Sequence, residues 1–227
     1  MRIKNNKVKL AIFDVNQTIF KFDEINKRFK EKGLNPILVD KWFTNILKEG
    51  FALSCLDKYI PFKVIAFEEL KKIIINERSK ISEKEIKYIL NGFQNLKPRS
   101  DIKKSFELLK KHKIEIVTLT NGPLLNSINL LKKNSLFKYV KECFSIEHVK
   151  SWKPNPKPYL NVLKNFDFLK SEIVMIAAHA WDLEGAKNIG IKTAYIKQYE
   201  KYTGKYYSRF NFTANNSLDI SKKISQG

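Results

Sequence analysis

The sequence predicts an α/β protein in which a doubly wound parallel sheet carries a helical cap inserted after the first strand. Residues 10–13 form an apolar run that ends at an acid, Asp14. Near-continuous aliphatic character of this kind suits a strand that is buried on both faces. From residue 101 onward, strand-like and helical segments alternate, which is typical of a parallel sheet with right-handed crossovers.

The stretch between these two parts has helical periodicity throughout. Apolar side chains recur at spacings of three and four, as in helices with one buried face. The expected helices cover residues 20–29, 37–48, 51–56 and 59–72, followed by one that starts after Ser82 and ends near Asn91. Ser82 and Glu85 have the form of a capping box. We therefore expect a core domain over residues 1–19 and 96–227, and a helical cap over residues 20–95.

The strands and helices of the core are predicted from the spacing of apolar residues and from the turn residues between them. Strands are expected over residues 114–119, 143–145, 173–178, 193–196 and 210–213, and helices over residues 101–111, 124–133, 156–166, 183–188 and 218–224. Pro156 suits the first turn of its helix, and Gly190 suits a helix end.

Composition favours a folded protein without a membrane partner. The chain is 43% hydrophobic and 12% aromatic, with only 8 Gly and 7 Pro, which argues against long disordered segments. No apolar run approaches the roughly 20 residues that span a bilayer, and the basic N-terminus lacks the features of a signal peptide. We expect a cytoplasmic protein in which Cys55 and Cys143 are buried free thiols.

The formal charge of +20 invites comparison with nucleic-acid-binding proteins. Arginine, which is favoured for forked phosphate contacts, supplies only a few of the 43 basic residues, and the lysines are scattered along the whole chain. We therefore do not expect nucleic-acid binding as the primary function.

Polar residues gather at four of the expected strand ends. They are, in chain order, Asp14 with Thr18, Thr120 with Asn121, Lys153, and His179 with Asp182. Open α/β sheets bind their ligands at the carboxyl ends of the strands, so we expect these side chains to converge on one crevice.

Four motifs around these residues, FDVNQT, LTNG, KPNPKPY and AAHAWDLEGA, resemble the haloacid dehalogenase superfamily, and most of all its type II 2-haloacid dehalogenase branch. The resemblance covers nearly the whole chain, including the helical cap. LTNG alone is common turn chemistry, whereas KPNPKPY and AAHAWDLEGA at this spacing are much more specific. The resemblance implies a metal-independent hydrolase that acts on a small anionic substrate, and a branch whose members form homodimers.

Three of the converging residues have a direct role in such chemistry. Asp14 is predicted to be the nucleophile, since a carboxylate can attack carbon or phosphorus and leave an ester or acyl phosphate. Thr18 is placed to donate a hydrogen bond to Asp14, and Lys153 to keep Asp14 ionised and neutralise the substrate. The structural alternatives are a helix-capping Asp, a Thr that caps a turn, and a surface Lys.

Three further residues are expected to support them. Asp182 would orient Lys153 or the hydrolytic water, or else cap the helix that follows it. His179 suits acid–base work near neutral pH, or else a hydrogen bond to the backbone. Tyr159 would position the loop through its hydroxyl, or else only pack its helix.

The LTNG motif is expected to hold the substrate. Thr120, with the backbone N–H groups that start the next helix, is predicted to bind an anionic substrate oxygen, and Asn121 to orient the water. The alternative for Thr120 is a helix cap.

Two positions argue against a magnesium-dependent phosphatase. Phosphatases of the superfamily resemble D-x-D at the first motif, where this chain has Asn16 in place of the second Asp. They also carry an Asp at the position of Ala177. Because Mg²⁺ demands a shell rich in oxygen ligands, we expect no metal site and no cofactor.

The sequence also departs from the dehalogenase pattern. The arginine that usually follows a Trp in the cap falls on Phe43, after Trp42, and the usual Ser and Asn of the fourth motif fall on Ala177 and His179. We expect Trp42 and Phe43 to cradle a halide or an apolar leaving group at their ring edges. Two alternatives stay open: a phosphatase-type hydrolase with a degraded metal site, and a non-catalytic binding protein that retains the fold.

Overall fold

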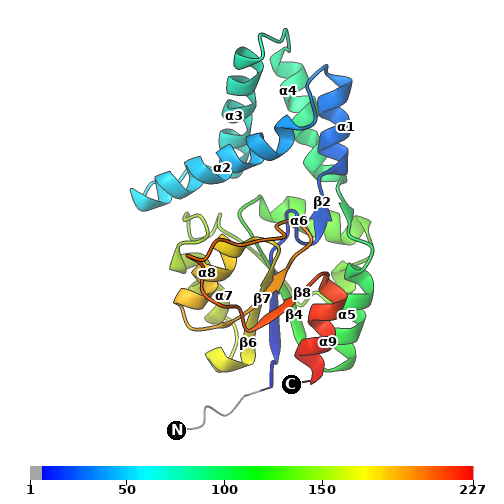
Figure 1. Cartoon of the computed structure of the whole chain (residues 1–227), viewed down its shortest axis with the longest axis vertical. Coiled ribbons are helices and arrows are strands. Elements are labelled where there is room, and N and C mark those ends of the chain that lie inside the picture. Colours follow the sequence, from blue (N-terminus) through cyan, green and yellow to red (C-terminus); the bar gives the residue numbers. More distant parts are fainter. Residues whose placement is uncertain (1–6, 227) are drawn as a thin grey trace.

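The computed structural model describes residues 7–226, and it confirms the predicted fold class. The main sheet has six strands in the order β5-β4-β1-β6-β7-β8, and each neighbouring pair is parallel (Figure 1). The strands are β1 (Leu10–Phe13), β4 (Glu115–Thr120), β5 (Glu142–Ser145), β6 (Ile173–Ala177), β7 (Lys192–Ile196) and β8 (Phe212–Ala214). β1 lies in the middle of the sheet, so the predicted nucleophile follows a central strand.

Helices cover both faces of this sheet because its strands are apolar on both sides. In β1, Leu10 and Ile12 belong to one hydrophobic cluster, while Ala11 and Phe13 belong to the other. Successive side chains of a strand point to opposite faces, so the two clusters are the two sides of the sheet. Three helices cover the face of Ala11 and Phe13: α5 (Ile102–Lys111), α6 (Leu124–Lys133) and α9 (Ser217–Gln226). Two helices cover the face of Leu10 and Ile12: α7 (Pro156–Leu163) and α8 (Ala180–Asn188).

The remaining helices form a separate layer above the carboxyl ends of the strands, at the top of Figure 1. They are α1 (Asp23–Glu31), α2 (Leu38–Cys55), α3 (Phe62–Asn76), α4 (Glu83–Leu90) and the 3-10 turn η1 (Asn91–Asn95). Two short antiparallel strands, β2 (Phe20–Lys21) and β3 (Lys97–Pro98), connect this cap layer with the core. Short 3-10 turns, η2 (Phe137–Tyr139) and η3 (Lys170–Glu172), complete the core.

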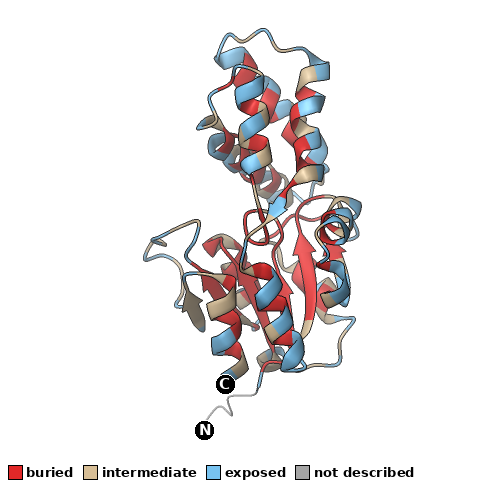
Figure 2. Cartoon of the chain, turned by 90° about the vertical axis from the view of Figure 1, so that its right-hand side faces the viewer, coloured by how far each residue is buried: buried red, intermediate tan, exposed pale blue. Residues whose placement is uncertain are grey.

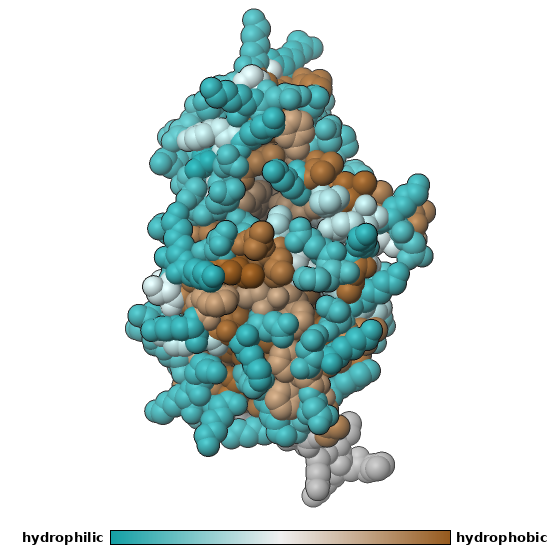
Figure 3. All heavy atoms as spheres, turned by 180° about the vertical axis from the view of Figure 1, so that it is seen from behind, coloured by the Kyte–Doolittle hydropathy of each residue, from teal (hydrophilic) through white to brown (hydrophobic). Residues whose placement is uncertain are grey.

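Each layer buries its own apolar face. In Figure 2 the buried residues line the inner sides of the cap helices and the whole of the central strands. The face seen in Figure 3 is mostly hydrophilic, and its largest apolar patches lie around the middle of the molecule. No helix within residues 7–226 is both long enough and apolar enough to cross a bilayer.

The cap rests on the core through Trp152, the residue before the predicted catalytic lysine. Its indole is fully buried, and Nε1 donates to the carbonyl of Ile60 at 3.1 Å. Its backbone N–H donates to the hydroxyl of Ser54 at 2.8 Å. A Cβ atom on Gly50 would lie 2.3 Å from the Trp152 ring, so this position of α2 requires glycine for the indole to fit.

Several local predictions differ from the structure. Residues 37–48 and 51–56 form one continuous helix, α2, because Gly50 lies inside it without breaking it. The capping box of Ser82 and Glu85 is confirmed. The prediction of two buried thiols is wrong for Cys55, which is exposed, while Cys143 is half-buried. Cys55 occupies the last residue of α2, where the helix leaves the cap interior.

Candidate active site

Asp14 directly follows β1, and the structure holds its carboxylate from two sides. Its backbone N–H donates to the carbonyl of Ile176 at 3.0 Å, which continues the pairing of β1 with β6. The Thr18 hydroxyl donates to Oδ2 of Asp14 at 2.7 Å and accepts from the N–H of Ala178 at 3.0 Å. Thr18 thereby ties the loop after β1 to the end of β6 and directs the carboxylate toward the cap.

Lys153 contacts the other carboxylate oxygen and is fully buried. Its Nζ donates to Oδ1 of Asp14 at 2.9 Å, to Oδ2 of Asp182 at 2.6 Å and to the carbonyl of Leu119 at 3.0 Å. All three hydrogens of the ammonium therefore have an acceptor. The backbone N–H of Lys153 donates to Oδ1 of Asn121 at 2.9 Å, which fixes the loop that carries the lysine.

Asp182 lies behind Lys153 and is also fully buried. Tyr159 donates its hydroxyl to Oδ1 of Asp182 at 2.6 Å and to the Asp182 carbonyl at 3.0 Å. Helix α8 begins at Ala180 with His179 as its N-cap residue, three residues earlier than predicted. Asp182 therefore lies in the first turn of α8, where its carboxylate faces the helix N-terminus, and it does not cap the helix.

The charges of this set keep Asp14 ionised. Burial raises the pKa of the Asp14 carboxyl, but the positive charge of Lys153 lowers it, and the pKa lies well below the ordinary value of 3.8. Burial lowers the pKa of Lys153, but the two carboxylates raise it above its ordinary value. Burial and the negative charge of Asp14 raise the pKa of Asp182. At neutral pH the arrangement is an anionic Asp14 held by a cationic lysine.

His179 faces the Oδ2 side of Asp14. Its Nδ1 lies 3.7 Å from Oδ2, which is too far for a hydrogen bond. Its Nε2 lies 2.9 Å from Oε1 of Gln17. The rings of Trp181 and Tyr199 surround the imidazole, with centroids at 5.5 and 5.2 Å.

A small cavity of ≈ 10 Å³ lies against Asp14. Its lining residues are Asp14, Asn16, Phe43, Leu47, Phe62, Asn121, His179 and Trp181. This volume is about that needed to hold one water molecule. Two polar atoms of its lining, Nδ1 of His179 and Nδ2 of Asn121, are buried and have no hydrogen-bond partner among the described residues.

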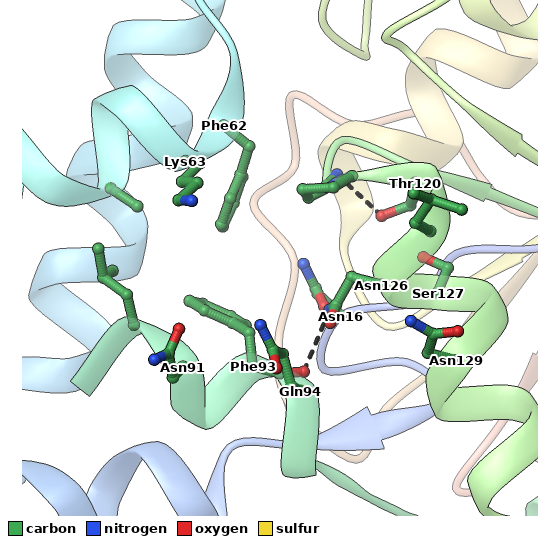
Figure 4. Close-up of a pocket in the computed structure, with 15 residues that line it drawn as sticks. Asn16, Phe62, Lys63, Asn91, Phe93, Gln94, Thr120, Asn126, Ser127 and Asn129 are labelled. Carbon is green, nitrogen blue, oxygen red and sulfur yellow. Dashed lines mark hydrogen bonds between the residues drawn. The ribbon is translucent and has the colours of Figure 1, made fainter. Parts of the chain in front are cut away.

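Two larger cavities, each of ≈ 310 Å³, share lining residues with the small one. The first borders it at Asn16 and Phe62 and opens between α3, η1 and α6 (Figure 4). Its lining is rich in amide and hydroxyl side chains, shown as sticks in Figure 4: Asn16, Asn91, Gln94, Thr120, Asn126, Ser127 and Asn129. The second borders it at Phe43 and His179 and reaches Tyr199. The space beside Asp14 thus continues in two directions.

The structure brings together most of the residues that the sequence singles out. Asp14, Thr18, Lys153, Asp182 and Tyr159 form one hydrogen-bonded set. The side chains of Asn121, His179 and Phe43 line the cavity beside it.

Two predicted substrate-binding residues, Trp42 and Thr120, do not line the small cavity beside Asp14. Trp42 is fully buried in the cap, where Nε1 donates to the carbonyl of Ala66 at 2.9 Å and the ring packs against Phe93. It lines none of the three cavities. Thr120 borders the larger cavity of Figure 4, but its hydroxyl accepts from the N–H of Gly122 at 2.9 Å. This contact closes a turn ahead of α6, whose N-cap residue is Pro123, so it does not correspond to the helix-cap alternative for Thr120.

The structure also shows site residues that the sequence analysis did not select. Gln17 and Trp181 lie inside the first and fourth motifs, so the motifs themselves were a usable signal. Asp40 of the cap contacts Gln17, and it precedes Phe43 by three residues on α2. That spacing places Asp40 and Phe43 on one helix face. Phe62 gives no comparable signal, because its place at the cavity depends on how α3 packs.

The residues present do not fit a magnesium shell. Within residues 7–226, no three side chains of His, Cys, Asp or Glu are grouped so that they could hold a metal ion. Asn16 lines the cavity where the superfamily's phosphatases have a second Asp, and Ala177 supplies no ligand. The Nζ of Lys153 already bridges Asp14 and Asp182 as a cation. The oxygen-rich coordination that Mg²⁺ demands is therefore not supplied.

The chain combines a parallel α/β core, a helical cap and a buried Asp–Lys–Asp set at the strand ends. The family model of the haloacid dehalogenase-like hydrolases matches residues 11–196. The chain therefore belongs to this family.

Curated relatives and solved structures agree with this membership. The chain is 23% identical over 200 residues to (S)-2-haloacid dehalogenase 1 of Pseudomonas sp. (strain CBS-3), covering 86% of each chain. It is 19% identical over 196 residues to (S)-2-haloacid dehalogenase 2 of the same strain, covering 85% of each. The structure of L-2-haloacid dehalogenase from Xanthobacter autotrophicus superposes with a TM-score of 0.88 at 16% identity, covering 96% of this chain and 98% of that one.

Proposed function

We propose that this protein is a metal-independent hydrolase that removes the halide from a 2-haloacid or a related small carboxylate. The observation that carries the proposal is the buried set of Asp14, Lys153 and Asp182, in which a lysine of the chain supplies the cation beside the nucleophile. The chain matches relatives named (S)-2-haloacid dehalogenases along most of their length, which supports the same reaction class.

In the first step, Oδ2 or Oδ1 of Asp14 attacks C2 of the substrate, and the bond from C2 to the halogen breaks. The electron pair leaves with the halide, and the product is an ester between Asp14 and the acid. Lys153 and Thr18 hold the carboxylate in place for this attack. Positioning of this kind lowers the barrier because the orientation of the carboxylate is fixed beforehand, so little further entropy is lost in the chemical step.

In the second step, water attacks Cγ of the Asp14 ester, and the bond breaks between Cγ and the Asp14 oxygen that is joined to C2. A 2-hydroxy acid leaves, and Asp14 retains one oxygen atom of the water. Asn121 lies at the cavity where that water would bind. Asp182 has its carboxylate on Lys153 and Tyr159, which favours the first of its two predicted roles, the orientation of Lys153.

The leaving-group side of the site is apolar. Phe43, Leu47, Phe62 and Trp181 line the cavity, and Phe43 stands where the family's branch usually has an arginine. Aromatic ring edges carry partial positive charge and can face an anion. We therefore expect a preference for bromide or iodide over fluoride as the leaving group, because weakly hydrated halides tolerate an apolar surrounding better.

The test is intact-mass spectrometry after the protein is mixed with a panel of 2-chloro- and 2-bromoalkanoates. We expect an adduct on Asp14 at short times, and incorporation of ¹⁸O into Asp14 after many turnovers in H₂¹⁸O. Asp14→Asn is the matched control and should show neither. Turnover should persist in EDTA.

Other outcomes identify the alternatives. Activity that disappears in EDTA and returns with Mg²⁺, or turnover of p-nitrophenyl phosphate with added Mg²⁺, contradicts the proposal and favours a phosphatase. Absence of any adduct across the panel favours a binding protein that retains the fold. The homodimer and the cytoplasmic location stay predictions.

A further inference from the structure

We propose that His179 is the general base that activates the hydrolytic water, and that Asp40 of the cap holds it in the required tautomer through Gln17. The inference rests on the proposed function, because it concerns hydrolysis of the Asp14 ester. It assigns a catalytic role to His179 and positioning roles to Gln17 and Asp40.

The tautomer follows from a chain of donors and acceptors. Ionised Asp40 can only accept, so the amide end of Gln17 that faces it, at 3.4 Å, carries the NH₂ group. The Tyr199 hydroxyl donates to the same Asp40 oxygen at 3.0 Å. Oε1 of Gln17 then faces Nε2 of His179 at 2.9 Å. Because this oxygen can only accept, Nε2 carries the hydrogen, and Nδ1 keeps a lone pair.

That lone pair belongs to the atom that faces the reaction centre. Nδ1 is buried, lies 3.7 Å from Oδ2 of Asp14 and has no partner among the described residues. Both atoms are acceptors in this tautomer, so they cannot bond directly, and a water between them can donate to Nδ1. His179, Asp14 and Asn121 line the cavity of ≈ 10 Å³, which suits one water.

Asn121 supplies the complementary donor. Its Oδ1 already accepts from the backbone of Lys153, so the orientation of its amide is set. Asn121 lines the cavity, and its Nδ2 is buried without a partner among the described residues. A donor next to Cγ of Asp14 can stabilise the oxygen that becomes negative when water adds to the ester. The cavity thus offers one acceptor for the attacking water and one donor for the developing anion.

Asp182 is the other carboxylate near Asp14, and its surroundings make it a poor base for this water. Oδ2 accepts from Lys153 and Oδ1 accepts from Tyr159. Asp182 does not line the cavity. Among the described residues that line the cavity, His179 is the one with a buried acceptor atom that has no partner.

The backbone of Gln17 is specialised for this contact. Its φ of 61° lies in the left-handed region, which is uncommon for residues other than glycine. Arg99 donates from Nε and Nη2 to the Gln17 carbonyl at 3.1 and 2.9 Å, and the Gln17 N–H donates to the carbonyl of Phe20. Backbone conformations of this kind persist where surrounding contacts enforce them, often at functional sites.

Hydrolysis of the ester moves one proton of the water through His179. The water oxygen bonds to Cγ of Asp14 as one water proton passes to Nδ1 of His179, which forms an imidazolium. The bond between Cγ and the former Asp14 oxygen on C2 then breaks, and the imidazolium proton passes to that oxygen to give the 2-hydroxy acid. Asp14 loses the second water proton to solvent, since its pKa lies below its ordinary value.

The charged groups around His179 set the conditions of the test. Asp14 faces it from the end of β1, Asp40 and Lys48 lie on α2, and Tyr199 and Glu200 lie after β7. Lys153 lies beyond Asp14 and over the ring of Trp181. Asp40→Asn removes one of these charges and shifts the pH profile by itself, so the test of Asp40 relies on the ring tautomer and on the level of the ester. His179 is replaced by Gln.

The first measurement is the ¹⁵N spectrum of the histidine rings in the whole protein at neutral pH. The chain has 3 His, and the signals absent from His179→Gln identify His179. We expect a neutral ring with hydrogen on Nε2. In Asp40→Asn, Gln17 is free to reverse its amide, and we expect the ring to lose this single tautomer. Asp23→Asn changes an exposed cap carboxylate that contacts Lys21, and the spectrum should remain as in the unaltered protein.

The second measurement is the fraction of protein that carries the ester during turnover of 2-bromopropionate. Ester should accumulate in His179→Gln, with hydrolysis slowed by about 10²-fold or more relative to ester formation. Asp40→Asn should show a smaller accumulation. A ring with hydrogen on Nδ1, or hydrolysis unchanged in His179→Gln, overturns the inference. Absence of both ester and halide release in the unaltered protein contradicts the proposed function instead, and the ring spectrum still decides the tautomer.

Discussion

The two sides of the Asp14 carboxylate differ in kind. On the Oδ1 side, Lys153, Asp182 and Tyr159 form a closed set in which each polar group has a partner. On the Oδ2 side, Thr18 donates a hydrogen bond, but His179 presents an unpartnered nitrogen to a cavity. The Oδ1 side lies within the core domain, whereas the Oδ2 side also receives residues from the cap. The difference indicates that one side maintains the charge of the nucleophile and the other provides space for the reacting groups.

Removal of the lysine should break the closed side most severely. In Lys153→Met, two buried carboxylates lose their shared cation, and we expect a loss of about 3–5 kcal/mol in the free energy of unfolding, together with loss of turnover. Urea denaturation measures the first and the halide assay the second. Adding Asp14→Asn to this variant removes one of the two negative charges and should restore part of the stability. A double variant no more stable than Lys153→Met would contradict the electrostatic explanation.

Loss of the tyrosine hydroxyl should weaken the same side less. Tyr159→Phe leaves Oδ1 of Asp182 without its donor, and a buried hydrogen bond to a charged group contributes about 1.5–3 kcal/mol. We expect a decrease of that order in the free energy of unfolding, measured in urea. Tyr202→Phe is the matched control, because Tyr202 is exposed, and its effect should be close to zero. Equal effects in the two variants would show that the Asp182 contact contributes nothing.

A methyl group at the cap contact should disturb the link between the cap and the lysine loop. In Gly50→Ala, the added Cβ lies within 2.3–2.8 Å of ring atoms of Trp152, and overpacking of this kind costs about 1–3 kcal/mol. The higher helix propensity of Ala offsets up to about 1 kcal/mol of this. We expect a lower melting temperature and a reduced rate of ester formation. Trp152→Leu removes the ring that the added Cβ would contact. The double variant Gly50→Ala, Trp152→Leu should therefore be more stable than Trp152→Leu alone.

We expect the smallest effect from a change of pH, because Lys153 on the Oδ1 side keeps Asp14 ionised. The pKa of Asp14 is lower in the folded state than its ordinary value of 3.8. Its ionised form therefore stabilises the fold above that value, and this contribution is lost as the pH falls through the folded pKa. Ester formation should vary less than about twofold between about pH 8 and pH 5. Rapid quenching followed by mass spectrometry measures its rate, and a steep fall of that rate within this range would contradict a lowered pKa of Asp14.

Much of the core could be predicted because its signals are local. The apolar run before Asp14, the turn after Thr120 and the motif that contains Asp182 each lie within a few residues. Parallel strands bring their carboxyl ends to one edge of the sheet, so residues in separate motifs were expected to meet there. The site residues of the cap were harder to predict. Trp42 and Phe43 are adjacent and both aromatic, but Trp42 is buried inside the cap, whereas Phe43 lines the cavity.

The sequence by itself determined the α/β class, the helical cap and the identity of the charged residues, because period, capping and motif spacing are properties of short segments. The tertiary structure decided which side chains share a cavity and which atoms lack partners. Asp40, Gln17 and His179 come from three distant segments, and their hydrogen bonds depend on the packing of the cap against the core. Local sequence preferences do not specify that packing, because many helix orientations bury the same apolar face.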